Sequence, residues 1–167
     1  MLFGTPSDFA VEIYHEPDSS RELGFGRMRI FIQGISIGDI EEQNCSLFHA
    51  VERIGEVAEA LPTFWETRFS QHTEEEIFSW LDAILFSGEI SEVGEDNIHR
   101  FIFLTNTGEQ FDDVKTFIIS PPNGSVRILF LKNDKFGSAT CQAPTYVSVA
   151  ASLGHWFKEQ TSGRDHI

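Results

Sequence analysis

The stretch 114-VKTFIISPPNGSVRILFLK-132 contains the clearest fold signal in the sequence. Residues 114–120 and 126–132 are rich in Val, Ile and Phe, whose side chains favour the pleated surface of a sheet. Between them, Pro121-Pro122-Asn123-Gly124 is typical of a tight turn. The stretch therefore predicts a β-hairpin. Because its apolar residues do not alternate strictly, we expect helices to cover one face of the sheet and loops part of the other.

Further strands are predicted on both sides of this hairpin. Alternation of apolar and polar side chains marks half-buried strands near the N-terminus, and short apolar runs mark the others. A loop rich in turn-forming residues is expected at 16–24, and a turn at 133–136. The predicted additional strands are 9–14, 27–33, 35–37, 100–104 and 137–142.

Three helices are predicted from periodicity and end signals. Apolar residues recur every three or four positions over 47–61, and Pro62 should end or kink that helix. Thr73 and Glu76 have the spacing of a capping box, so a second helix should begin there. A third is expected from about Pro144 through Phe157. The expected fold class is α+β, as one domain over 1–167: a mainly antiparallel sheet with about three helices packed against it.

The chain is strongly acidic. Its 167 residues contain 26 Asp and Glu against 12 Lys and Arg, which gives a formal net charge of -14. This balance argues against nucleic acid and anionic membrane surfaces as partners, because both are negatively charged. The longest apolar runs have four residues and the first ten residues contain no Lys or Arg, so neither a membrane span nor a standard signal peptide is expected. We therefore expect a soluble cytoplasmic protein.

One motif resembles the nucleophile elbow of hydrolases. Gly34-Ile35-Ser36-Ile37-Gly38 fits Gly-x-Ser-x-Gly, but the elbow needs a helix directly after the serine. Ile on both sides of Ser36 favours extended backbone, so a hairpin is the preferred interpretation.

Cys45, His49 and Glu52 are the other candidates for chemistry. We expect them on one helical face, where they could form a thiolate–base pair or three metal ligands. Glu56 and Glu59 continue the same stripe, which favours an ordinary solvated face. Gly24-Phe25-Gly26 lacks the third glycine of a dinucleotide motif. A bridge between Cys45 and Cys141 is possible but not implied, and no catalytic, cofactor-binding or metal-binding residue is predicted.

Acidic residues are clustered along the chain. Between Phe69 and His99 there are eight carboxylates and no Lys or Arg. Two smaller clusters are Asp39, Glu41 and Glu42, and Glu109, Asp112 and Asp113. Each cluster alone is explained by solubility. Together they favour a basic partner, because complementary charge speeds association.

Several stretches, in order along nearly the whole chain, resemble the immunity protein 42 family of bacterial polymorphic toxin systems. They are 24–30 (GFGRMRI), 37–39 (IGD), 44–47 (NCSL), 104–109 (LTNTGE), 111–113 (FDD), 115–117 (KTF) and 137–141 (GSATC). The resemblance implies a non-enzymatic cytoplasmic inhibitor that occludes the active or functional surface of a cognate toxin domain. Gly24, Gly26 and Gly38 look like backbone requirements, and Asn44 or Ser46 is a candidate helix cap.

Of the clusters, Asp39, Glu41, Glu42, Glu109, Asp112 and Asp113 are the candidates for the toxin interface. Two other classes stay open. An acidic secretion chaperone would bind an extended segment of an effector rather than a folded toxin domain. An enzyme that uses Cys45 or Ser36 ranks third.

Overall fold

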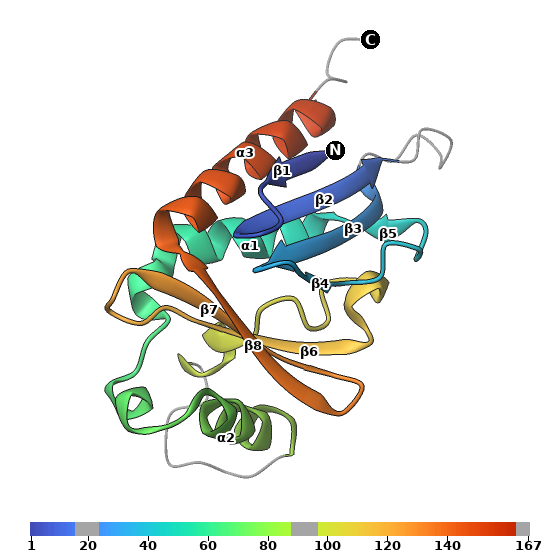
Figure 1. The fold of residues 1–167 in the computed structure, drawn as a ribbon. Helices are drawn as coiled ribbons and strands as arrows, with labels where there is room; N and C mark the ends of the chain where they lie inside the picture. The colour runs from blue at the N-terminus through green and yellow to red at the C-terminus, as the bar shows by residue number, and fades with distance from the viewer. Residues whose placement is uncertain (16–23, 88–96, 163–167) are drawn as a thin grey trace.

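The computed structural model describes residues 1–15, 24–87 and 97–162 (Figure 1). Over these ranges the chain forms two antiparallel sheets and three α-helices, which confirms the α+β class. Most of the loop predicted at 16–24 lies outside the described residues. In the described part of the chain, no helix has the length and apolar character of a membrane span.

The first sheet is built around its longest strand. Its strands are β1 (Leu2–Gly4), β2 (Phe9–His15), β3 (Phe25–Ile32), β4 (Ile35–Ile37) and β5 (Cys45–Ser46). β2 pairs with β3 over its full length, while β4 and β5 pair with opposite ends of β3. Buried and half-buried residues alternate along β3, as the sequence pattern predicts.

The second sheet contains the predicted hairpin. It is a three-stranded meander of β6 (Val114–Ile119), β7 (Ser125–Lys132) and β8 (Lys135–Gln142). Asn133 and Asp134 both have positive φ, 51° and 58°, which suits a two-residue hairpin turn. β8 therefore begins two residues before the predicted strand at 137–142. The sheets approach each other where the Gln33 side-chain carbonyl accepts the N–H of Thr140, at 2.9 Å.

The strand predicted at 100–104 does not form. Residues His99–Phe101 make a short 3₁₀ turn, η4, and Ile102 alone forms a bridge to Phe117. Phe101, Phe103 and Leu104 are fully buried, so the run is apolar because it crosses the core. A short apolar run does not distinguish such a segment from a strand.

The helices cover the sheets as expected. They are α1 (Phe48–Ala60), α2 (Glu74–Phe86) and α3 (Ala143–Ser162). α1 and α3 pack against each other beside the first sheet, and α2 lies against the second (Figure 1). Pro62 ends α1 as predicted, in the 3₁₀ turn η1 (Leu61–Thr63). The capping box of Thr73 and Glu76 is confirmed at the start of α2.

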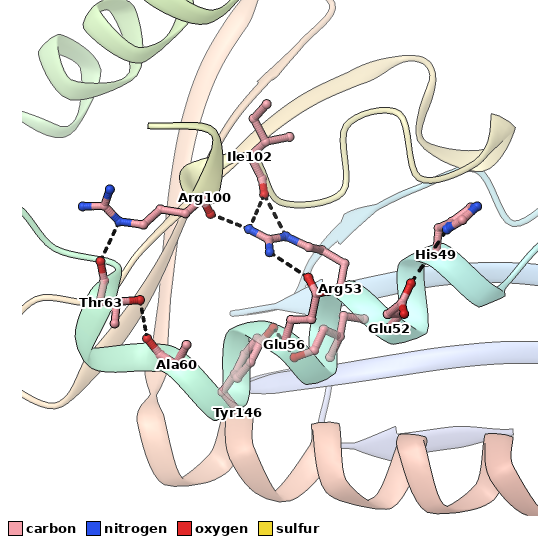
Figure 2. A network of polar contacts seen from close by, with 10 residues as sticks. His49, Glu52, Arg53, Glu56, Ala60, Thr63, Arg100, Ile102 and Tyr146 are labelled. Atoms are coloured by element: carbon pink, nitrogen blue, oxygen red, sulfur yellow. Dashed lines mark hydrogen bonds and ion pairs between the residues drawn. The ribbon is translucent and has the colours of Figure 1, made fainter. Parts of the chain in front are cut away.

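Arg53 connects α1 to the segment that follows η4 (Figure 2). Its Nε and Nη2 donate to the carbonyl of Ile102 at 3.0 and 2.8 Å, and Nη2 also donates to the carbonyl of Arg100. Its Nη1 reaches Glu56 at 3.0 Å. The guanidinium therefore satisfies carbonyls that a strand at 100–104 would have offered to a neighbouring strand.

Tyr146 of α3 lies at the centre of the core. Its ring packs 4.8 Å from that of Phe9 and 6.3 Å from that of Phe103. Its hydroxyl donates to the carbonyl of Ile54 at 3.2 Å, so the buried polar atom has a partner. One apolar cluster includes residues of both sheets and all three helices.

Candidate interaction surface

Two acidic segments that are distant in the sequence lie side by side in the structure. The backbone N–H of Asp39, directly after β4, donates to the carbonyl of Gln110 at 2.7 Å. Gln110 belongs to the 3₁₀ turn η5 (Glu109–Phe111) before β6. The contact brings together two of the predicted acidic clusters. We call the combined surface the acidic patch, which consists of Asp39, Glu41, Glu42, Glu109, Asp112 and Asp113.

The close approach of the two segments depends on Gly38. This residue has φ +101°, and a Cβ at its position would lie 2.7 Å from the Phe111 ring. Phe111 is fully buried and anchors the second acidic segment in the core. The fully buried Gln110 adds a long contact from its side-chain amide to the carbonyl of Ser46, at 3.5 Å. Gly38 is therefore a backbone requirement, as expected from the sequence.

All six carboxylates of the patch are exposed. Asp39 accepts the backbone N–H of Glu41 at 2.9 Å, which shapes the first segment. Asp113 faces Lys132 at 3.5 Å and is therefore partly neutralised, so it has a structural partner that the sequence did not indicate. Solvent screens charges over about 8 Å at physiological salt. Carboxylates within that distance of an approaching molecule therefore act on it together, as a combined negative field.

The described carboxylates of the acidic run around α2 mainly form contacts within the protein. Glu74 pairs with Arg127 at 2.8 Å, and Asp82 pairs with Lys115. Glu76 accepts the N–H of Thr73 at 2.8 Å, and this hydrogen bond lowers the pKa of its carboxyl. Glu75 is exposed on α2, and the remaining carboxylates of the run, Glu89, Glu92, Glu95 and Asp96, lie outside the described residues.

Ser36 does not lie in a nucleophile elbow. It belongs to β4 and pairs with Phe31 across the β3–β4 hairpin, and β4 is not followed directly by a helix. The hairpin interpretation is confirmed, because a serine in this position lacks the helix N-terminus that the elbow requires.

The predicted helical face of Cys45, His49 and Glu52 is wrong. Cys45 lies in β5 and is buried, whereas α1 begins at Phe48. His49 and Glu52 are exposed and lie 3.9 Å apart. Over residues 1–15, 24–87 and 97–162, no group of three or more His, Cys, Asp or Glu side chains could hold a metal ion.

The two cysteines are not joined by a disulfide and are buried on different strands, β5 and β8. Burial, together with the nearby Asp8, raises the pKa of the Cys141 thiol to about 12. A thiol with such a pKa stays protonated near neutral pH and is a poor nucleophile.

Neither Asn44 nor Ser46 caps α1. The N-cap position is Leu47, without a side-chain cap, and Ser46 belongs to β5. Asn44 instead has φ 57°, the left-handed conformation that asparagine tolerates. The short strand β5 therefore ends just before the N-cap of the helix. The sequence does not predict this strand, because two residues give too little periodicity.

Comparison with known families identifies the class of protein. The clustered carboxylates are exposed, whereas both thiols are buried and Ser36 is held in a hairpin, and this arrangement suits a binding protein. A family model of immunity proteins matches residues 1–156. In particular, the chain belongs to the family Immunity protein 42. No curated protein and no solved structure matched the chain. Membership indicates a role in immunity to a toxin and a protein toxin as the general kind of partner, and immunity proteins are generally non-enzymatic.

Proposed function

We propose that this protein binds a cognate toxin domain in the cytoplasm and neutralises it by occluding its active or functional surface, with the acidic patch as part of the interface. The observation that carries the proposal is the backbone contact between Asp39 and Gln110, which gathers two acidic segments on one exposed surface. Family membership supplies the toxin as partner. The protein needs no catalytic residue for this function, since tight binding alone blocks access.

The patch defines the electrostatic character of the proposed partner. A basic toxin surface would be attracted to the exposed carboxylates, and such steering raises association rates to about 10⁸ M⁻¹s⁻¹ at low salt. A standard interface buries about 1,600 Å² in total, so the patch would form only a part of it. We therefore expect the carboxylates to determine rate and selectivity, and apolar contacts around them to supply most of the affinity.

The first test is charge reversal within the patch. Glu109→Lys combined with Asp112→Lys leaves the pair of Asp113 and Lys132 in place. The probe is a toxin domain sought in the reading frames next to the gene for this chain, and we expect its association rate to fall about tenfold at low salt and to depend less on salt. Stopped-flow or biolayer measurements over a salt series give both quantities.

The control is Gln71→Lys combined with Glu75→Lys and Ser79→Lys, which changes the net charge by the same amount on exposed residues of α2 and of the segment before it. Equal rates for the patch variant and the control variant would remove the acidic patch from the interface. A toxin that stays active in the presence of excess protein would contradict neutralisation. Binding to an extended effector peptide, without binding to the folded toxin domain, would favour the secretion chaperone instead.

A further inference from the structure

A second surface, separate from the acidic patch, lies between α1 and α3. A groove of about 850 Å³ runs along the line where these helices meet. Buried Val51 and Ala150 contribute to its floor. Phe48 and Val147 also line it and are 50% and 40% exposed, so they add apolar surface to the groove that is accessible from outside.

The two exposed apolar residues lie toward opposite ends of the groove. Phe48 begins α1, and its ring lies 6.3 Å from that of Phe157 near the end of α3, so the helices run antiparallel. From Val147 to Phe157, α3 rises about 15 Å. That length equals about three turns of helix, the size of one amphipathic helical segment laid between two others.

Glycines keep the middle of the groove open. Gly55 and Gly154 both line it, and a Cβ at either position would meet no atom within 4 Å. Glycine inside a helix costs about 1 kcal/mol relative to alanine. Packing within this chain therefore does not require glycine at either position. The close approach of the backbone of another molecule would require it.

Charge on the walls indicates what kind of helix fits. Glu52, Glu56 and Glu59 line the α1 wall; Glu56 pairs with Arg53, and Glu52 lies 3.9 Å from His49. The α3 wall has Lys158 and His155, and His155 pairs with Glu159 at 3.3 Å. The groove is therefore acidic overall. A second copy of this chain is disfavoured as occupant, because each copy has a net charge of -14.

We propose that the α1–α3 groove binds an amphipathic helix of a protein partner, with an apolar face against Phe48 and Val147 and with Lys or Arg along the edge that meets the carboxylates of α1. The proposal does not depend on the acidic patch, since the two surfaces belong to different elements. The occupant is therefore a helix that is apolar on one face and basic along one edge.

The test uses a synthetic peptide of 18 residues that contains Leu, Ala and Lys, with Leu on one helical face and Lys along the one edge that is to meet the α1 carboxylates. A second peptide has Glu in place of every Lys. In NMR titrations of the full chain, we expect the Lys peptide to shift the amide signals of Gly55 and Gly154 and to bind about tenfold or more tightly than the Glu peptide. Equal binding of both peptides, or shifts that avoid the groove, would overturn the proposal.

Filling the groove supplies a variant that should remain folded. Gly55→Leu combined with Gly154→Leu places side chains in open space and improves helix propensity. Its thermal midpoint should equal or exceed that of the parent, while affinity for the Lys peptide falls about tenfold or more. Should the Leu variant unfold, Gly55→Ala combined with Gly154→Ala takes its place. Unchanged affinity in a folded filled variant would contradict the groove as the site.

A charge-matched pair separates groove binding from general attraction to an acidic protein. Glu52→Lys with Glu59→Lys changes the groove, and Glu41→Lys with Glu42→Lys changes the acidic patch by the same charge. The first should weaken the Lys peptide about fivefold more than the second. Equal effects would mean non-specific attraction and overturn the proposal. Toxin association measured on the same variants separates a failed groove from a failed patch.

Discussion

At the scale of single residues, burial determines the chemistry of the titratable groups in the core. Tyr146 is fully buried, and burial raises the pKa of its hydroxyl well above the usual value, with the nearby Cys141 adding to the effect and Arg53 opposing it. Burial also raises the pKa of the Cys141 thiol to about 12. Both groups therefore keep their protons in the folded state at pH values where the unfolded chain has lost them.

The sign of the resulting pH dependence follows from this proton balance. Above about pH 9 these two groups bind fewer protons in the unfolded state than in the folded state, so their contribution to the free energy of unfolding should decrease as pH rises and be constant below that value. Urea unfolding at about pH 8 and about pH 11 should show this loss, and Cys141→Ala should reduce it. If Cys141→Ala and the parent lost stability equally, the buried thiol would not be its source.

At the scale of elements, the start of α2 shows how one side chain fixes a helix end. The Thr73 hydroxyl accepts the N–H of Glu76 at 3.2 Å, and the Glu76 carboxylate accepts the N–H of Thr73. α1 has no side-chain cap and instead follows directly from β5. The two helices therefore begin for different reasons, α2 through local hydrogen bonds and α1 through the pairing of the preceding strand with β3.

Removing the cap should destabilise the protein. Thr73→Ala leaves the Glu76 N–H without its partner and should lower the free energy of unfolding by about 1 kcal/mol. Thr73→Ser keeps a hydroxyl and should cost much less. Chemical denaturation of the three proteins provides the comparison, and equal stabilities of the Ala and Ser variants would show that the hydroxyl does not contribute.

At the scale of the whole molecule, Arg53 joins the part of the fold around the first sheet to the part around the second. Its guanidinium comes from α1 and binds the carbonyls of Arg100 and Ile102 (Figure 2). Ile102 in turn forms a bridge to Phe117 of β6. The apolar cluster is also shared between the sheets. We therefore propose that the chain is one domain that unfolds in one cooperative transition.

Loss of the Arg53 contacts should lower the stability of the folded protein. Arg53→Met leaves partly buried carbonyls without their donor and should lower the free energy of unfolding by about 2–3 kcal/mol. Glu56→Gln changes only the exposed end of the ion pair and should cost less than about 1 kcal/mol. Calorimetry on both variants measures the difference in their stability. Calorimetry on the parent protein shows whether it unfolds in a single transition. Two separate transitions in the parent would contradict the single domain.

Local patterns in the sequence determined most of the elements and the class of the fold. The hairpin of β6 and β7, the alternation along β3, the capping box of α2 and the end of α1 at Pro62 all depend on neighbours within a few residues, so the sequence alone predicts them. The order of motifs along the chain likewise indicated the family.

Only the tertiary structure decided which distant residues meet. It placed Asp39 beside Gln110, buried Cys45 in a two-residue strand, and let Arg53 take the carbonyls of the segment predicted as a strand at 100–104. It also left the α1–α3 groove open between two helices whose apolar faces looked like ordinary core. These features depend on contacts between segments far apart in the chain. The hydrophobic periodicity of one segment indicates its secondary structure but not which other segment it will contact.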